Sequence, residues 1–391
     1  MNLIRVDELI LFDESGFAYS RTKLVDDGLP HLRPFNISDD GRLDLRQTYQ
    51  VPAADAPMSK REIAAGDVLF NNTNSVELVG KAAIVRERMV AGYSNHLTRI
   101  RVDATRVNPE YFALWLQRLR YTGFFSAQAT QWVSQAAFKT SELRKLEIDL
   151  PSLADQCRIV DLLSRAEGIV RLRRKAQQKA AQLIPAIFTD MFGDPATNPK
   201  GWPQKRLGEV VRLASGGTPP KVRPEFWEGD LPWVSPKDMK RDEIADATDH
   251  VSRRVLAETS LKLVPVDSVL IVVRGMILVH TVPVAITRAP VTINQDMKAL
   301  QPEACLTATF LHWLLKASHS TLLAAVSTAA HGTKKLDTKV LATMLIPTPP
   351  LDLQRKLGLQ VLAARSILNQ QAEALMKATA TFDALLSQAF H

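Results

Sequence analysis

The stretch LPWVSP, residues 231–236, has a counterpart in LPHLRP, residues 29–34. Leu, Pro and Pro keep the same spacing in both stretches, which start 202 residues apart (231 − 29 = 202). Because Leu and Pro are common residues, one match of this kind is weak. The rest of the chain decides whether the two stretches belong to a repeat.

Further matches occur along the whole chain at almost the same shift. The shift falls only to 198 residues at the later matches (341 − 143 = 198), whereas accidental matches would scatter over many shifts. We therefore infer a tandem duplication with small insertions in loops. The matches are RVDEL (5–9) with RLGEV (206–210), Gly16 with Gly217, FALWL (112–116) with FLHWL (310–314), and Leu143, Leu146, Ile148, Pro151, Leu153 and Gln156 with Leu341, Met344, Ile346, Pro349, Leu351 and Gln354.

Each copy starts with a globular part that mixes strands and helices. β-type runs such as DVLF (67–70) and SVLIVV (268–273) are punctuated by Gly, Pro and Asn, and an amphipathic segment follows. The sequence predicts an α+β fold: two tandem globular α/β parts separated by two long helices. We expect the first globular part at residues 1–150, a long helix at 151–192, a Pro- and Gly-rich linker at 193–203, the second globular part at 204–350 and a second long helix at 351–391.

The two predicted helices carry apolar residues at seven-residue spacing, which is typical of a coiled coil. Ser152 and Asp155 form a capping-box pattern at the start of the first helix. Since the stripes match, we expect the helices to pair antiparallel in a pseudo-two-fold, circular arrangement of the copies. The first stripe comprises Ile159, Ala166, Arg173, Ala180 and Ile187 with Leu162, Ile169, Ala176 and Leu183 between them, and the second comprises Leu357, Ala364, Gln371, Ala378 and Leu385 with Val361, Leu368, Leu375 and Phe382.

Polar residues interrupt both stripes at equivalent positions, Arg173 and Gln371. We expect these side chains to approach each other at the pseudo-two-fold axis, where a polar layer fixes the register of a coiled coil. Pro185 is expected to kink or end the first helix near Ile184, because proline has no N–H to donate.

Composition indicates a soluble, cytoplasmic protein. The 391 residues are 46% hydrophobic and 23% charged, and no apolar run of eighteen residues predicts a membrane span. Acidic residues within the apolar N-terminal run argue against a secretory signal. The two cysteines are far apart and indicate neither a disulfide framework nor a zinc site. A net charge of +8 favours a polyanionic partner.

The sequence lacks the motifs of an autonomous catalyst. It has no GxxxxGK[ST] loop for phosphates, and its eight histidines show no metal-ligand spacing. PTPPLD (347–352) lacks the acidic or amide residue and the aromatic residue that a methyltransferase motif would need. We therefore predict no catalytic residue and no metal in this chain.

Several motifs resemble one family. KRLGEVVRLASGGTPPK with FWEGDLPWVSPKDM resembles the start of a target-recognition domain in specificity subunits of type I restriction–modification enzymes. IDLPSLADQCRIVDLL and IPTPPLDLQRKLGLQVL resemble the starts of the spacer helices of this family, and FGDPATNPKGW resembles its linker. The second helix departs from the usual Glu-Gln by carrying Leu353-Gln354, and the first copy lacks the Gly-Gly-Thr-Pro segment.

The resemblance implies a non-catalytic subunit that reads double-stranded DNA. Each globular part would bind half of an asymmetric, bipartite target, and the coiled coil would set the gap. The implied partners are two modification subunits, which bring S-adenosylmethionine, and restriction (motor-nuclease) subunits, which use ATP and magnesium. A helix of about 33 residues, about 50 Å long at 1.5 Å per residue, suffices for half-sites about 34–36 Å apart.

Candidate DNA contacts are cationic and amide side chains in loops, which suit phosphates and base edges. The segment at 134–135 aligns with 332–333 at the shift of 198 and resembles a DNA-facing loop of the family. The indole of Trp132 is suited to stacking on a base, but we expect this residue to lie in the core. The candidates are Arg33, Asn36, Asn71, Asn72, Asn95, His96, Gln131, Ser134 and Gln135 in the first copy, and Lys237, Arg274, Asn294, Gln295, His331, Gly332, Thr333, Lys334 and Lys335 in the second.

Two other functions remain open at this stage. A fused methyltransferase and recognition protein would bind S-adenosylmethionine by itself, and the missing motifs count against it. A duplicated protein–protein scaffold would hold partners without DNA, and salt-sensitive binding to a bipartite duplex would exclude it.

Overall fold

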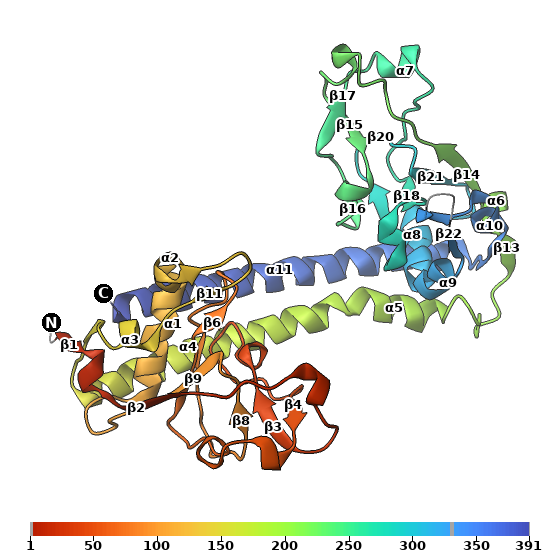
Figure 1. Ribbon diagram of the computed structural model, residues 1–391. Coiled ribbons are helices and arrows are strands. Elements are labelled where there is room, and N and C mark those ends of the chain that lie inside the picture. Colours follow the sequence, from red (N-terminus) through yellow and green to blue (C-terminus); the bar gives the residue numbers. More distant parts are fainter. Residues whose placement is uncertain (1–2, 329–331, 391) are drawn as a thin grey trace. The chain divides into compact units, whose positions relative to one another are not determined.

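The computed structural model describes residues 3–328 and 332–390, and the chain divides into two compact units (Figure 1). Unit 1 comprises Met1–Arg174 and Ala374–His391, and unit 2 comprises Lys175–Glu373. Each unit contains one globular copy together with a part of both long helical regions.

The larger sheet has the same strand order in both units, which confirms the duplication at the level of topology. Four antiparallel strands form its centre, and unit 2 adds β16 (Glu243–Ile244) parallel to its neighbour. In unit 1 the order is β2 (Ile10–Ser15), β9 (Leu97–Val102), β5 (Val68–Asn71) and β7 (Ala82–Ile84); in unit 2 it is β14 (Val211–Ser215), β21 (Met297–Pro302), β18 (Val269–Val272) and β19 (Val284–Thr287).

The repeated Leu-Pro stretches form the middle strands of a smaller sheet in each unit. These strands, β3 (Leu29–Leu32) and β15 (Leu231–Val234), each have one antiparallel and one parallel neighbour. Their leucines are buried, and the second proline of each stretch starts a 3-10 helix, where its missing N–H costs little. The neighbours are β4 (Tyr49–Val51) and β8 (Gly92–Tyr93) in unit 1, and β17 (Asp249–Val251) and β20 (Thr292–Ile293) in unit 2.

Several of the remaining elements also occur in matching pairs. A two-stranded sheet joins the two ends of each globular part: β1 (Leu3–Arg5) with β12 (Glu147–Asp149), and β13 (Gln204–Arg206) with β24 (Leu345–Pro347). The helices are α1 (Pro109–Tyr121), α2 (Phe124–Gln128) and α3 (Thr140–Leu143) in unit 1, and α6 (Leu207–Val210), α7 (Val255–Glu258), α8 (Ala308–Ala317), α9 (His319–Ala324) and α10 (Thr338–Thr343) in unit 2. Short hairpins are formed by β10 (Thr130–Gln131) with β11 (Ala136–Ala137), which also pairs with β6 (Thr73–Asn74), and by β22 (Val326–Thr328) with β23 (Lys334–Leu336).

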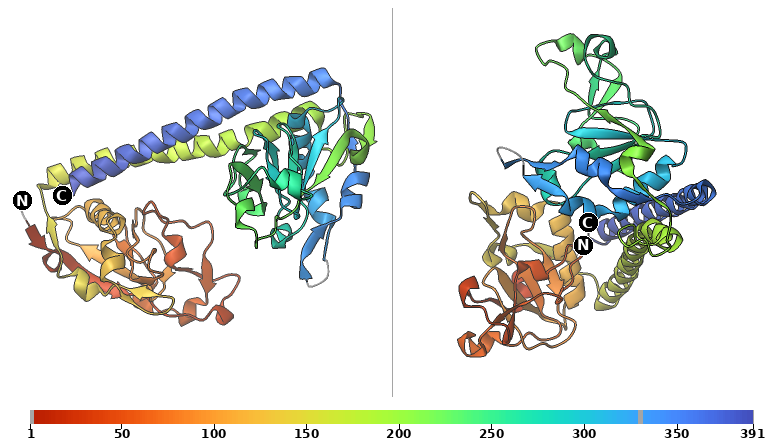
Figure 2. Two further views of the ribbon diagram at one scale, coloured as in Figure 1. Left: turned by 90° about the horizontal axis from the view of Figure 1, so that it is seen from above. Right: turned by 90° about the vertical axis from the view of Figure 1, so that its right-hand side faces the viewer.

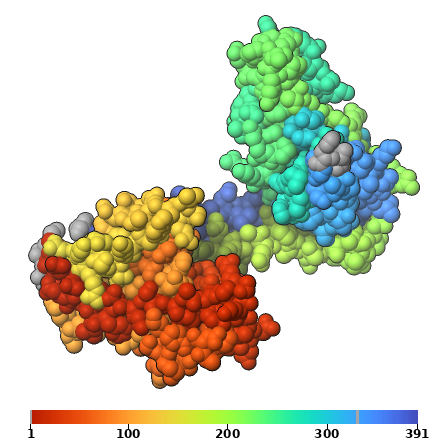
Figure 3. All heavy atoms as spheres, in the orientation of Figure 1, coloured from red at the N-terminus to blue at the C-terminus, as the bar shows by residue number. Residues whose placement is uncertain are grey.

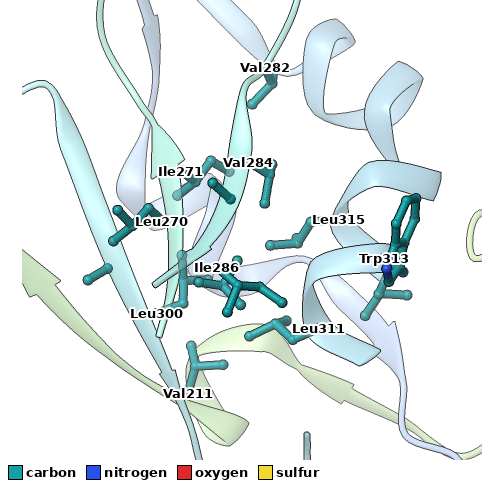
Figure 4. Packing of buried hydrophobic residues seen from close by; sticks show 14 of the residues in the cluster. Val211, Leu270, Ile271, Val282, Val284, Ile286, Leu300, Leu311, Trp313 and Leu315 are labelled. Carbon is teal, nitrogen blue, oxygen red and sulfur yellow. The ribbon is translucent and has the colours of Figure 1, made fainter. Parts of the chain in front are cut away.

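The core of unit 2 lies between the larger sheet and α8. Figure 4 shows Leu311 and Leu315 of α8 pointing toward strand residues such as Val284 and Ile286. These side chains are almost completely buried. Burial of this kind supplies roughly 1.5–3 kcal/mol for each large aliphatic side chain, so the sheet and its covering helix depend on each other.

The match of Gly16 with Gly217 is wrong by one residue, because the contacts of Gly16 recur at Gly216. A Cβ on Gly16 would collide with the carbonyl oxygens of Tyr93 and Ser94, and one on Gly216 with those of Ile293 and Asn294. The pairing of β2 with β9 is irregular between Ile10 and Phe12, whereas that of β14 with β21 is regular. β2 therefore contains one residue more than β14, which shifts the sequence match by one position without changing the backbone contact.

The long helical regions are α4 (Leu153–Ala181), α5 (Leu183–Phe192) and α11 (Leu351–Ala389). Ser152 caps α4 by accepting from the Asp155 N–H at 3.2 Å, as its capping-box pattern predicts. The predicted break near Pro185 is confirmed, but it falls at Gln182. Proline at position 185 cannot donate to the carbonyl oxygen of residue 181, four residues earlier, so the interruption comes before the proline.

Both units confirm the antiparallel pairing of the helices. In unit 1 the first part of α4 packs against the last part of α11 through Leu163, Val170, Phe382 and Leu386. In unit 2, α5 and the first part of α11 contribute to a single core. Figures 1 and 2 show α11 alongside α4 in unit 1 and alongside α5 in unit 2.

The predicted stripe of α11 is confirmed, whereas the stripe of α4 was partly wrong. Leu162 and Ile169 are 50% and 53% exposed, and the next residues, Leu163 and Val170, are buried instead. The seam on α4 alternates steps of four and three from Ile159, so the intermediate positions lie one residue later than predicted.

The polar pair predicted at the centre of the helices is not tested by the structure. Arg173 is exposed and Gln371 is half-buried. These two residues belong to different units, and their predicted approach stays a prediction.

A buried glutamine joins each long helix to its own globular part. The Gln156 amide accepts from the Asn108 N–H at 2.7 Å and donates to the carbonyl oxygens of Arg106 and Pro151 at 3.2 and 2.9 Å. Gln156 is fully buried. Its amide oxygen and nitrogen therefore both serve to connect the helix to the loop before α1.

Gln354 repeats this arrangement in unit 2. It accepts from the Thr307 N–H at 2.9 Å and donates to the carbonyl oxygens of Cys305 and Pro349 at 3.0 and 2.8 Å. The glutamines therefore explain the repeated Pro-x-x-x-x-Gln pattern. Asp155, the residue before the first glutamine, instead contacts side chains of its own helical turn, which is why Leu353 can replace the acidic residue in the second copy.

An ion pair fixes each globular part against its helix, with opposite polarity in the two units. In unit 1, Arg42 of the globular part donates to Glu167 of α4 at 2.6 and 2.8 Å. In unit 2, Glu243 of the globular part accepts from Arg365 of α11. Glu243 also accepts from Arg288, and the two guanidinium groups lower the pKa of its carboxyl group although burial opposes this shift.

We expect Gln354→Ala to lower the free energy of unfolding by about 2–4 kcal/mol, because three backbone groups are left without their partner in a buried site. Thermal unfolding followed by circular dichroism measures the change. Gln178→Ala is the matched control, since Gln178 is exposed on α4. Equal stability of the two variants would contradict a connecting role for Gln354.

Reversal of one charge of the Arg42–Glu167 ion pair should destabilise the protein, and reversal of the second charge should restore the lost stability. Glu167→Arg places two cations together and should cost about 1.5–3 kcal/mol, whereas Arg42→Glu with Glu167→Arg recreates the polarity of unit 2. Denaturant unfolding of the single and double variants measures the coupling, with Glu87→Arg at an exposed position as control. A double variant no more stable than Glu167→Arg would contradict the pairing.

Candidate nucleic-acid interface

Several predicted DNA-contact residues of unit 1 line one hollow. Its volume is about 690 Å³. The 3-10 helix after β3, the turn between β8 and β9, and the hairpin β10–β11 supply its walls. The predicted residues among its lining are Arg33, Asn95, His96 and Gln135, and the additional ones include Arg21, Phe35, Asn74 and Lys81.

Arg33 is held in place at the end of β3. Its guanidinium group donates to the Tyr19 carbonyl oxygen at 2.9 Å and lies over the Tyr49 ring at 4.8 Å from the centroid. Burial lowers the pKa of Arg33 from its ordinary value, mainly by desolvation. An arginine keeps its charge at neutral pH in spite of such a shift, so Arg33 supplies a fixed cation to the hollow.

Asn95 and His96 lie in the tight turn before β9. The backbone carbonyl of Asn95 accepts from Ser15 Oγ at 3.1 Å and from Asn72 Nδ2 at 3.3 Å. The Asn95 side chain is exposed, and that of His96 is half-buried. The turn is thus fixed through its backbone while the Asn95 amide stays accessible to a ligand.

Three of the predicted asparagines are buried and support loops. Asn36 is 1% exposed and closes the 3-10 helix by accepting from the Arg33 N–H at 2.8 Å, as Asp238 does from Ser235 in unit 2. Asn71 donates to the Leu78 carbonyl oxygen at 3.0 Å, and Asn294 accepts from the Asp296 N–H at 3.1 Å. These side chains shape the surface and do not lie on it.

Asn72 is half-buried and lies beside a second hollow of unit 1, of about 350 Å³. Its amide donates to Thr98 Oγ1 at 2.8 Å. Asn72 therefore links the strand after β5 to β9, and this role does not require contact with a ligand.

The hairpin β10–β11 presents its tip to solvent. Gln131, Ser134 and Gln135 are exposed, as expected of ligand-facing residues. Trp132 is 60% exposed, so the expectation that it lies in the core was wrong. In the space-filling view the gold-to-yellow segment that contains α2 and this hairpin lies on the surface of unit 1 (Figure 3).

In unit 2 the fold brings three predicted segments together. The backbone of Arg274 forms a β-bridge with Lys335, and its N–H donates to the Asp296 carbonyl oxygen at 3.2 Å. Gln295, in the same turn as Asp296, accepts from the Thr218 hydroxyl group. Arg274 and the turn that contains Gln295 are far from Lys335 in sequence, yet the fold brings them to the edge of the hairpin β22–β23 at which Lys335 lies.

The hairpin of unit 2 carries two cations. Lys334 Nζ donates to Thr328 Oγ1 at 2.9 Å, and Lys335 Nζ pairs with Asp337 at 3.1 Å. Because Lys335 has an acidic neighbour, Lys334 is the better-placed of the two for a phosphate.

The turn of this hairpin contains the other predicted residues. Gly332 is exposed with a positive φ of 77°, and Thr333 is half-buried. His331 lies outside the described residues, so its predicted DNA contact stays a prediction.

Lys237 belongs to a different part of unit 2. It pairs with Asp249 at 2.7 Å and lines a hollow of about 480 Å³ with Lys240 and Arg241. Acidic side chains line the same hollow, so its charge is mixed; they are Asp238, Glu243 and Asp246. This surface is less suited to a polyanion than the hairpin β22–β23.

Within residues 3–328 and 332–390, no group of three or more His, Cys, Asp or Glu side chains has the arrangement of a metal site. Among the helices of the same described part, none has the length and apolar character needed to cross a membrane.

A family model described as type I restriction modification DNA specificity domain matches residues 199–362. The chain is similar to the EcoR124I/EcoR124II type I restriction enzyme specificity subunit of Escherichia coli, with 30% identity over 257 residues. These residues cover 65% of this chain and 63% of that subunit, so the chain spans less than two thirds of the length of this relative.

Two solved structures share the fold of the whole chain. One, from work on complex assembly and conformational transition of the type I R-M system, has a TM-score of 0.66 at 22% identity and covers 99% of this chain and 97% of that chain. The other is the S subunit of a type I restriction-modification system from M. genitalium, with a TM-score of 0.58 at 15% identity, covering 100% of this chain and 96% of that chain.

The duplicated α+β scaffold with its pair of long helices is thus the fold of these two solved structures. Residues 199–362 match the type I restriction modification DNA specificity domain, and the chain is similar to type I restriction enzyme specificity subunits, so the resemblance carried by its motifs is confirmed.

Removal of the two hairpin cations should weaken DNA binding and make it less sensitive to salt. Lys334→Ala with Lys335→Ala should lower the slope of log K against log salt by up to about two units, because each cation that meets a phosphate contributes about one unit. Binding of the chain to duplex DNA at several salt concentrations measures this slope. Lys356→Ala, at an exposed position on α11, is the control. An unchanged slope in the double variant would remove the hairpin from the phosphate interface.

Proposed function

We propose that this chain is the sequence-specific DNA-recognition subunit of a type I restriction–modification complex. Its first globular part (1–150) and second globular part (204–350) act as two target-recognition domains, each for one half of an asymmetric, bipartite target. The helical regions at 151–192 and 351–391, with the linker at 193–203, act as the spacer between them.

The observation that carries this proposal is a repeated scaffold with unlike side chains at its exposed loops. Strand order, hairpins and glutamine contacts recur in both units. The hairpin tip is apolar and amide-rich in unit 1, whereas the hairpin of unit 2 carries Lys334 and Lys335. The two globular parts share one topology but expose different groups for contact with bases and phosphates. This combination suits two different half-sites.

The helices have the dimensions of a spacer on DNA. α11 contains 39 residues. At 1.5 Å per residue such a helix is about 58 Å long, which exceeds the roughly 34–36 Å between half-sites one helical turn apart. The connecting glutamines fix each helix to its recognition domain. In the proposed complex, the length of the helices therefore sets the distance between the half-sites along the duplex.

The proposal includes the partners that perform the chemistry. Two modification subunits dock on the chain and bring S-adenosylmethionine for adenine methylation, and motor-nuclease subunits that use ATP and magnesium cleave unmodified DNA. This chain contributes no catalytic residue and holds none of these cofactors. Its own residues position the complex, and its reading of base edges decides where methylation and cleavage occur.

Gln135→Ala should change the bases methylated in one half-site and leave the other half-site and the gap unchanged. Gln135 is an exposed amide at the hollow of unit 1, which is the geometry needed to read a base edge. Methylome sequencing of cells that carry the chain with its modification subunit measures the motif. The control is Gln128→Ala, an exposed amide on α2 of the same unit.

The unmutated chain provides the test of the function itself. A methylated motif in two parts with a fixed gap, together with salt-sensitive binding to that duplex, is the expected result. Methylation without a bipartite motif, or assembly with partners in the absence of any specific DNA binding, would favour a protein–protein scaffold instead. If Gln135→Ala leaves a bipartite motif unaltered, the proposed base-reading role of Gln135 is wrong and the proposed function of the chain still stands.

A further inference from the structure

The tip of the hairpin β10–β11 exposes two adjacent apolar side chains. Trp132 is 60% exposed and Val133 is fully exposed, at 108% of its reference area. We call Trp132 and Val133 the apolar tip. Tryptophan is highly buried on average in folded proteins, so its display at a protruding turn makes it a candidate for contact with a ligand.

The backbone beneath the apolar tip is firmly supported. The Trp132 N–H donates to the Gln135 carbonyl oxygen at 2.7 Å, and Gln131 pairs with Ala136 in the hairpin. Ala136 also pairs with Asn74 of β6 and is fully buried. The tip is therefore a projection from an ordered three-stranded sheet, and its exposure is not the result of a missing support.

Hydrogen-bonding groups flank the apolar tip, and one of them lines a hollow that also contains cationic residues. Gln131, Ser134 and Gln135 flank it, and Gln135 lines the same hollow as Arg33 and Lys81. A purely apolar protein groove would leave these polar groups without partners. A nucleic acid offers phosphates and base edges to the polar groups and flat base faces to the indole, so it matches the whole surface.

The second copy carries different chemistry on its hairpin. Lys334 and Lys335 in β23 correspond to Ala136 and Ala137 in β11 at the shift of 198 residues. The hairpin of unit 1 thus lacks the two lysines that could bind a phosphate of the DNA backbone. What it presents to solvent is the apolar tip.

We propose that the apolar tip enters the half-site read by unit 1 and unstacks one base step, with the Trp132 indole stacked on the uncovered base. This inference rests on the proposed DNA-reading function and adds a specificity-determining element to it. Pyrimidine–purine steps unstack most readily, so the half-site of unit 1 should contain such a step where the tip enters. Bases at this step are selected by how easily they separate, and not by hydrogen bonds alone.

The test uses the full chain assembled with its modification subunit and duplexes that carry the methylated motif. 2-Aminopurine, whose fluorescence rises when it unstacks, is placed at each position of both half-sites in turn. The unmutated complex should give a rise at one step of one half-site. Trp132→Ala should abolish the rise and weaken binding about 10-fold, the effect of removing one base–aromatic stack, with the salt slope unchanged.

Two variants serve as controls. Trp132→Phe keeps an aromatic face and should retain most of the fluorescence rise. Met58→Ala removes another exposed apolar side chain of unit 1, at 76% exposure, and should leave both binding and fluorescence unchanged.

The outcomes separate the apolar tip from the proposed function. Specific, salt-sensitive binding with no fluorescence rise at any step, or with an unchanged rise in Trp132→Ala, overturns the unstacking role and leaves the DNA-reading function intact. Absence of specific binding by the unmutated complex overturns both. If Trp132→Ala prevents assembly with the modification subunit, as measured by analytical ultracentrifugation, the tip is a protein contact and the inference is wrong.

Discussion

The hydrogen bonds of Gln156 and Gln354 are the interactions on which the architecture depends. Each amide satisfies three backbone groups at the place where a globular part ends and a long helix begins. A buried amide with this many partners allows few alternative geometries, since each displaced partner costs desolvation energy that nothing offsets. A flexible joint at these two positions would uncouple each globular part from its long helix.

Duplication creates a problem that the ion pairs address. Two related globular parts and two related helices could pair in the wrong combination. The globular part carries the cation in unit 1 and the anion in unit 2. A wrong combination would bring Arg42 against Arg365 or Glu243 against Glu167, and such like-charge contacts disfavour the mispaired state. The buried apolar seam supplies most of the stability, and the charges select the partner.

The same scaffold leaves its loop tips free to diverge. Strand residues and the residues that close the 3-10 helices, Asn36 and Asp238, are fixed by backbone hydrogen bonds within each unit. Residues at the hairpin tips make few such bonds, so their side chains can change without disrupting the fold. This separation allows the hairpin of unit 1 to carry an apolar tip, whereas Lys334 and Lys335 of unit 2 lie in the strand β23.

The sequence by itself determined the repeat, the α+β class, the two long helices and the family resemblance, because these follow from spacing and local pattern along the chain. It also placed Arg33, Asn95, His96 and Gln135 among the candidates, although nothing local could tell them from Asn36, Asn71 and Asn294, whose side chains are buried. The seam of α4 was predicted one residue off at Leu162 and Ile169, since a heptad read from one helix does not show which neighbouring position faces the partner. Only the tertiary structure decided that Trp132 lies outside the core, that Arg42 meets Glu167, and that Arg274 lies beside Lys335. The physical reason is that burial and pairing of these side chains depend on segments distant in sequence, which local composition and periodicity do not encode.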